Sequence, residues 1–296
     1  MNYLFKIVIA MLLWGSIGIF VKNIDLPSIE LVFLRAIIAS FVLAIYGLVI
    51  RSTKNNELMK SETTPKYKNK NIYYLIISGI AMGLNWLFLF QSYKYTTISN
   101  STLSYYCAPI FVILLSPFIL KEKFTKSKFL AVLVAMVGLF LILSNQISAY
   151  NSSYNHVKGI VYGLIAAILY ASIILLNKYI KGLSGYEMTV IQISTAALVL
   201  LPFVILRHKL HISNTKTLVF VLIVGVIHTG LAYLLYFSSI KYIKAQSVAV
   251  ISYIDPISAL IFGAIFLKET MSTTQILGGI LILLSTFFGN LDKNKA

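Results

Sequence analysis

The chain has 296 residues, of which 58% are hydrophobic and 11% are charged, and its mean hydropathy is +0.86. Soluble domains carry roughly 25% charged residues, so this chain cannot cover a water-facing surface and most of its surface must face lipid. A single cysteine excludes an internal disulfide and any multi-cysteine metal site. The net charge of +16 sits in lysine clusters between apolar runs, which indicates membrane orientation and no nucleic-acid partner.

Ten apolar runs follow one another along the chain. Each is close to the roughly 20 residues that span about 30 Å of hydrocarbon at a rise of 1.5 Å per residue. Lipid offers the backbone no hydrogen-bond partner, so each run must be helical. The predicted fold is an all-α membrane protein with ten transmembrane helices. The runs are 4–21, 29–50, 72–92, 98–120, 127–145, 158–178, 186–206, 216–240, 245–267 and 273–290.

Two stretches share one pattern at a distance of 147 positions (245 minus 98), namely 98–122 and 245–269. Tyr106 pairs with Tyr253, Pro109 pairs with Pro256, and both stretches end in Leu-Lys-Glu. We therefore predict two domains of five helices each, residues 1–150 and 151–296. An odd number of helices forces the second copy to lie inverted relative to the first, around a central cavity that holds a site at mid-membrane.

The outer helices repeat as well, at a slightly longer distance. Trp14-Gly15-Ser16 resembles Tyr170-Ala171-Ser172, and Glu30 resembles Glu187. The joint between the two halves is predicted at 146–157.

Lysine and arginine in the connections predict the orientation of the chain. With the N-terminus inside, 17 of these residues lie on the inner side and seven on the outer side. We therefore expect both termini in the cytoplasm of a multi-pass protein of the plasma or inner membrane. The lysine-rich connection at 51–71 either anchors this orientation or contacts anionic lipid headgroups.

Nine polar or aromatic residues lie roughly 9–15 positions from the starts of their helices, which places them near the bilayer middle. The repeat superposes three aromatic pairs, because Trp14 falls on Tyr170, Trp86 on Tyr233 and Tyr106 on Tyr253. Interface belts lie at the headgroups, so these rings either pack helices or line a cavity. We predict a substrate-binding role for the set Trp14, Asn85, Trp86, Tyr106, Tyr170, His228, Tyr233, Tyr253 and Asp255.

Asp255 is the most informative of these residues. A carboxylate at mid-bilayer costs about 2.5–3.5 kcal/mol, so it should face the protein interior or water. It either bonds to a neighbouring helix as a protonated acid, or acts as the counter-charge for a substrate amine or as a proton-binding group. His228 either shares protons with it or makes an ordinary hydrogen bond. Asn85 either contacts the cavity or joins helices.

Other polar and small residues also have structural interpretations. Arg35 either extends outward, pairs with Glu30 or Asp25, or binds a substrate carboxylate. The pairs Gly79-Gly83 and Gly159-Gly163 have the spacing of close helix contacts.

Enzyme motifs are absent from the sequence. It has no Walker loop, no Gly-x-Ser-x-Gly, no paired acidic diphosphate motif and no His/Cys cluster, so we expect no enzyme, cofactor or metal. Without a nucleotide site, a gradient or the substrate itself must drive transport. The expected partners are a small-molecule substrate, membrane lipids and protons as a coupling ion, with the chain acting as a monomer or a homodimer.

Residues 12–24 with 29–40 resemble the opening of a repeat of the drug/metabolite transporter superfamily, EamA type, and residues 93–143 and 240–289 resemble its closing portion. The resemblance implies ten helices, both ends inside, inverted halves and a central cavity. Members of the superfamily move amino acids, amines, nucleotide sugars and other small metabolites, often outward, and some couple to protons or exchange substrates.

The sequence departs from the family pattern at two places. Gln192 stands in the second half where the first half has Arg35, and Asp255 is not part of the general pattern. Glu122 and Glu269 match the family's glutamate, which the resemblance implies ends its helix and pairs with nearby lysines.

These observations predict a secondary-active, alternating-access transporter of a small polar metabolite, such as an amino acid or an amine or quaternary ammonium compound. The alternatives are an exporter of another small metabolite or drug, such as a nucleoside or sugar, an intramembrane enzyme acting on lipid-linked substrates, or a passive channel.

Overall fold

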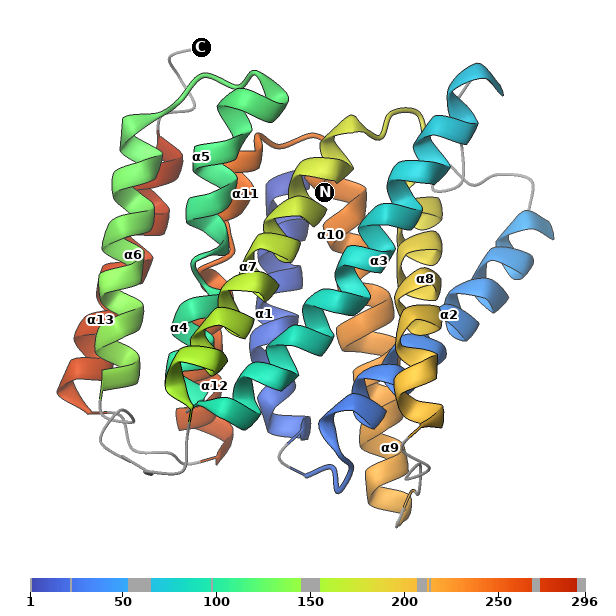
Figure 1. Cartoon of the computed structure of the whole chain (residues 1–296), viewed down its shortest axis with the longest axis horizontal. Helices are drawn as coiled ribbons and strands as arrows, with labels where there is room; N and C mark the ends of the chain where they lie inside the picture. Colours follow the sequence, from blue (N-terminus) through green and yellow to red (C-terminus); the bar gives the residue numbers. More distant parts are fainter. Residues whose placement is uncertain are drawn as a thin grey trace. The chain divides into compact units, whose positions relative to one another are not determined.

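The computed structural model describes residues 2–21, 23–52, 65–96, 98–144, 155–206, 212, 214–267 and 272–291, and these are all-helical (Figure 1). Most of the 51–71 connection, most of the 146–157 joint, and Glu269 lie outside the described residues. The helices are α1 (Tyr3–Val21), α2 (Ser28–Ser52), α3 (Pro65–Tyr95), α4 (Ile98–Tyr105), α5 (Ala108–Leu120), α6 (Lys126–Ser144), α7 (His156–Tyr179), α8 (Gly185–Ile205), α9 (Thr215–Ile223), the π-helix η2 (Val224–Leu231), α10 (Ala232–Ile240), α11 (Ala245–Ile251), α12 (Ile254–Leu267) and α13 (Thr273–Leu291).

Within the described residues, each apolar run of the sequence is helical. Eight spans are long and apolar enough to cross a membrane by length and composition. The other two predicted runs correspond to α6 and α13, which have 19 residues each. The prediction of an all-helical protein compatible with a membrane is confirmed, and the largest shift of an end is in α3, which begins at Pro65.

Two spans that we expected to be continuous are broken in the middle. The break between α4 and α5 falls at Tyr106 and Cys107, and the break between α11 and α12 falls at Ser252 and Tyr253. A proline follows each break, namely Pro109 and Pro256. Each span is interrupted there because the proline ring removes a helical donor and clashes with the preceding turn. Tyr106 and Tyr253 are repeat mates, so both halves interrupt this span at the same position.

A third span changes its winding at η2. Thr229 Oγ1 donates to the Val224 carbonyl oxygen at 2.9 Å, five residues back, within the wider π turn. Gly225 permits close packing here, because a Cβ on it would lie 2.6 Å from Cγ2 of Ile38. Single π segments inside α-helices are frequent at functional sites.

The chain forms two compact units, and each unit takes helices from both halves of the sequence. Unit 1 comprises residues 1–84 and 176–242, and unit 2 comprises residues 85–175 and 243–296. The long helices α3 and α7 contribute to both units. This division follows contacts in space, whereas the predicted division at residue 150 follows the sequence repeat.

Unit 1 is held together by a buried polar cluster. Ser78 Oγ donates to Gln192 Oε1 at 2.5 Å, and Asn177 Nδ2 donates to both Gln192 Oε1 and Ser78 Oγ. Gly79 allows this approach, because a Cβ on it would lie 2.6 Å from Cβ of Thr195 on α8. The predicted close helix contact at Gly79 is confirmed, and hydrogen bonds between apolar helices reinforce it.

Unit 2 contains the helix pair α6 and α13, which lie side by side in Figure 1. A Cβ on Gly138 would lie 2.6 Å from the Gly278 carbonyl oxygen, so the two backbones touch. The predicted contacts on α7 are also confirmed, because Cβ atoms on Gly159 and Gly163 would meet Thr96 and Ser104.

Glu122 has a different role from the one we expected. Its Oε1 accepts a hydrogen bond from the backbone N–H of Ala245 at 3.0 Å, at the start of α11. The residue before α11, Lys244, supplies no side-chain cap, so Glu122 provides one from the other half of the chain. Gln246 Nε2 completes the contact by donating to the Lys123 carbonyl oxygen at 3.0 Å.

We predict that Gly278→Ala will lower the stability of the protein by about 1–3 kcal/mol, because the added methyl separates α6 from α13. Gly18→Ala is the control, since a Cβ there meets nothing within 4 Å. It should be neutral or stabilise the helix by about 0.5–1 kcal/mol. Unfolding of the two purified variants in detergent will measure the difference, and an equal effect would disprove the close contact.

We predict that Glu122→Ala will cost about 0.5–2 kcal/mol, the usual range for the loss of a helix cap. Glu122→Gln keeps an acceptor oxygen and should retain most of the stability. The same unfolding assay compares the two variants. If glutamine is as destabilising as alanine, the carboxylate acts through its charge and not as a cap.

Candidate functional site

The nine residues predicted to bind substrate separate into two groups, one in each compact unit. Trp14, His228 and Tyr233 belong to unit 1. The other six belong to unit 2, and they are Asn85, Trp86, Tyr106, Tyr170, Tyr253 and Asp255.

Asp255 lies in the first turn of α12, directly after the helix break, and it is half-buried. The Tyr106 hydroxyl donates to Asp255 Oδ2 at 2.9 Å. The N-terminus of α12 adds a partial positive charge, which favours a carboxylate in the first turn. The break therefore places an acid beside a tyrosine within a membrane span.

Tyr253 connects the two breaks of unit 2. Its side chain is fully buried, and its hydroxyl donates to the carbonyl oxygen of Tyr106 at 2.9 Å. The two rings stack with centroids 6.1 Å apart and an interplanar angle of 28°. A broken helix leaves carbonyl groups without helical partners, and Tyr253 satisfies one of them.

Two further tyrosines extend this group, which we call the tyrosine–aspartate cluster (Tyr105, Tyr106, Tyr170, Tyr253 and Asp255). The Tyr105 ring packs edge-on against Tyr106 at 5.5 Å and stacks on Tyr170 at 5.7 Å. Tyr105, Tyr106 and Tyr170 are each half-buried. Sequence reasoning missed Tyr105, although its position beside Tyr106 at mid-depth carried the signal.

Asn85 and Trp86 are buried between helices of unit 2. Asn85 is 1% exposed, and its Nδ2 donates to the Ala166 carbonyl oxygen at 2.6 Å. This bond joins α3 to α7 and is the helix-joining interpretation left open above. Trp86 is 5% exposed. A substrate role for these two residues stays a prediction.

Unit 1 brings Trp14 and His228 together. The Trp14 Nε1–H donates to the carbonyl oxygen of His228 at 3.0 Å, within η2. The indole also packs on Tyr233 at 4.7 Å and on Tyr236 at 5.2 Å. Sequence reasoning missed Tyr236, which follows Tyr233 by three residues and therefore shares its helix face.

The His228 ring is buried between α1 side chains. Its Nε2 lies 3.0 Å from Ser16 Oγ, and the Phe20 ring is 4.9 Å away. His228 thus makes an ordinary hydrogen bond within unit 1.

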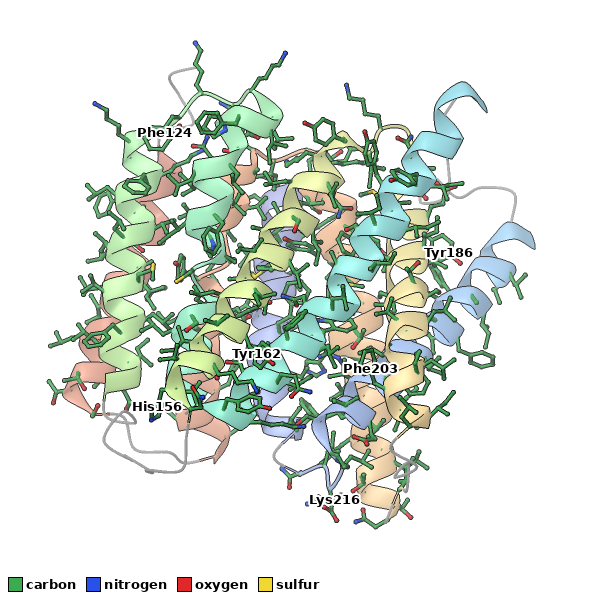
Figure 2. All side chains as sticks on the ribbon, viewed as in Figure 1. Phe124, His156, Tyr162, Tyr186, Phe203 and Lys216 are labelled. Carbon is green, nitrogen blue, oxygen red and sulfur yellow. The ribbon has the colours of Figure 1, made fainter. Side chains whose placement is uncertain are left out.

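A tyrosine pair elsewhere in unit 2 shows how the rings of this protein hold a cation. The Lys158 ammonium lies 4.1 Å from the ring centroid of Tyr95 and 6.0 Å from that of Tyr162, which Figure 2 labels on α7. A cation over an aromatic face is stabilised by about 0.5–2 kcal/mol, depending on desolvation.

The chain offers no obvious metal site among its described residues. No three His, Cys, Asp or Glu side chains there lie close enough to hold an ion. The chemistry available in the tyrosine–aspartate cluster is aromatic surface, hydroxyl groups and one carboxylate.

A solved crystal structure has the same fold over almost the whole chain. The TM-score is 0.82 at 16% sequence identity, and the match covers 99% of both chains. An identity this low supports the fold alone.

Sequence comparisons give relatives of similar length. An uncharacterized transporter of Bacillus subtilis, YxxF, is 30% identical over 281 residues, which is 94% of this chain and 86% of the relative. An uncharacterized transporter of Archaeoglobus fulgidus is 23% identical over 94% of this chain and 92% of its own. An uncharacterized transporter of Helicobacter pylori strain J99 is 26% identical over 97% of this chain and 96% of its own.

The profile of the EamA-like transporter family matches residues 1–144 and again residues 157–291. Both matches together include all the helices described above. These relatives are transporters and not enzymes. The chain therefore belongs to the EamA-like transporter family.

Proposed function

We propose that this transporter carries a small polar metabolite with an ammonium group, such as an amino acid, an amine or a quaternary ammonium compound, by secondary-active alternating access. The observation that carries the proposal is the half-buried Asp255 at a helix break, bonded to Tyr106 and surrounded by tyrosine rings. Family membership supports transport, and the substrate class rests on this cluster.

The binding of an ammonium group follows from the charges and rings of the cluster. A carboxylate inside a membrane span is costly, and a cation bound beside it offsets that cost. The half-buried Tyr105, Tyr106 and Tyr170 would supply ring faces, and the Lys158 ammonium lies over the Tyr95 ring elsewhere in the same unit. Asp255 would hold the charge and the rings would hold the carbon groups around it.

Alternating access is supported by the sequence repeat and by the paired breaks. Both halves interrupt the same span at Tyr106 and Tyr253, and discontinuous helices are typical of sites in transporters built from inverted repeats. We propose that residues 1–150 and 151–296 are inverted copies of one another. The lysine distribution supports cytoplasmic termini in the cell membrane.

A second candidate substrate has a flat ring, such as a nucleoside or an aromatic drug moving outward. Tyr105 and Tyr170 favour it because their rings are stacked at 23°, and parallel aromatic faces suit another planar group. This candidate depends on the rings and does not need the charge of Asp255, so substitution of the acid distinguishes the two.

The Asp255→Asn variant tests the charge directly. Amines and amino acids would first be screened for a rise in the melting temperature of the purified protein, which reports binding. The compounds that bind would then be assayed for saturable counterflow in proteoliposomes, with wild-type and variant protein. Loss of a charged hydrogen-bond partner costs about 1.5–3 kcal/mol, so we expect the Kd of the amine to rise roughly 10–150-fold. Asp25→Asn is the matched control, because Asp25 is exposed between α1 and α2.

Protection of Cys107 provides a second readout. Cys107 is the single cysteine of the chain, directly follows Tyr106 and is half-buried. A bound amine should slow its alkylation by N-ethylmaleimide, with Cys107→Ser as the blank. If Asp255→Asn transports the amine as well as Asp25→Asn does, and protection is unchanged, the ammonium proposal is wrong and the planar-ring candidate takes its place.

The bond between Tyr106 and Asp255 predicts a coupling between their substitutions. Tyr106→Phe alone removes the hydroxyl from the half-buried Asp255 carboxylate and should destabilise the protein by about 1–3 kcal/mol. In the Asp255→Asn background the same change should cost clearly less, because its charged partner has gone. Unfolding of the wild-type, the two single variants and the double variant measures this, and additive costs would show that the bond contributes nothing.

A further inference from the structure

Glu30 is a fully buried acid whose side chain makes no hydrogen bond. It lies in the first turn of α2, within a membrane span, and is 0% exposed. Neither Oε1 nor Oε2 has a hydrogen-bond partner. Burying a carboxylate without partners is expensive, and such groups in native proteins call for a specific explanation.

The repeat supplies a direct comparison within unit 1. Glu187 occupies the same position in α8 that Glu30 occupies in α2. Its Oε2 accepts hydrogen bonds from the backbone N–H of Ser184 at 2.8 Å and from Ser184 Oγ at 2.9 Å. Together with the bond from the Glu187 N–H to Ser184 Oγ, this is a complete capping box.

Pro27 prevents the same arrangement in the first half. It stands three residues before Glu30, as Ser184 stands three residues before Glu187. Proline has neither a backbone N–H nor a hydroxyl group, so it can donate nothing to the carboxylate. The acid is therefore present at Glu30 without the capping role that explains Glu187.

The ionisable side chains on neighbouring helices are bonded elsewhere. The elements packed against α2 are α8, α9 and η2. Tyr186 on α8 donates to the Leu43 carbonyl oxygen, and Glu187 belongs to its capping box. Lys216 on α9 donates to Asn23.

On η2, His228 Nε2 lies within hydrogen-bond distance of Ser16 Oγ, as described above, whereas its Nδ1 has no hydrogen-bond partner. On α2 itself, Arg35 donates no hydrogen bond to Glu30, since neither carboxylate oxygen has a hydrogen-bond partner. The described part of unit 1 therefore supplies no hydrogen-bonded counter-charge for this acid.

We propose that Glu30 binds a small cation, H⁺ or Na⁺, and that this is the coupling-ion site of the transporter. Either ion neutralises the carboxylate and occupies oxygens that the protein leaves unbonded. The proposal rests on transport by this chain and is independent of the amine substrate.

Carbodiimide labelling of the unmodified protein tests the proposal. Dicyclohexylcarbodiimide enters apolar regions and reacts with protonated carboxyl groups, and peptide mass spectrometry will compare Glu30 with Glu187 in the same sample. Faster labelling of Glu30 at lower pH, unaffected by Na⁺, identifies the ion as H⁺. Slower labelling in NaCl than in KCl at equal ionic strength identifies it as Na⁺.

The matched variants Glu30→Gln and Glu187→Gln will be compared by thermal unfolding. For Na⁺, the wild-type melting temperature should rise by about 3 °C at roughly ten times Kd, and Glu30→Gln alone should lose the rise. For H⁺, Glu30→Gln alone should change the pH dependence of the melting temperature. If Glu30 labels no faster than Glu187 and responds to neither ion, the proposal is overturned, whether or not Glu30→Gln can be purified.

Discussion

A membrane span gives its polar atoms no water, so each of them must find a partner inside the protein. Most of the polar groups described here obey this constraint. Ser78, Asn177 and Gln192 bond to one another, and Tyr253 bonds to the carbonyl oxygen that a helix break exposes. The same constraint gives meaning to the exceptions, because an acid that stays unpaired in such surroundings retains a cost that a ligand can offset.

Hydropathy predicted the helices because the spanning length and the lack of backbone partners follow from composition alone. It did not predict the breaks at Tyr106 and Tyr253, because a proline in an apolar run is compatible with a kink as well as with two separate helices. The π turn at η2 depends on packing of Gly225 against Ile38, which is a contact between distant segments. The cap that Glu122 provides to α11 is likewise invisible locally, since 123 positions separate the bonded residues.

The site was predictable in its residue types and less so in its grouping. Mid-depth counting identified Tyr106, Tyr170, Tyr253 and Asp255, which the structure brings together with Tyr105 in one unit. It could not separate these from Trp14, His228 and Tyr233, because depth along a helix says nothing about which helices pack together. Depth along a helix also does not predict what a polar side chain contacts. At the depth of Asn85 an amide could face a ligand, but the structure shows it donating to the Ala166 carbonyl oxygen.

The differences between the repeats show where the two copies have taken separate roles. Gln192 stands where the first half has Arg35, and it belongs to the buried cluster with Ser78 and Asn177. Glu187 forms a capping box with Ser184, whereas Glu30 cannot form one because Pro27 stands in the place of the serine. In the tyrosine–aspartate cluster the second half carries Asp255 and the first half has the buried Ala108. At each of these matched positions the two copies therefore differ in side chain or in bonding, so neither unit is symmetric in its polar groups.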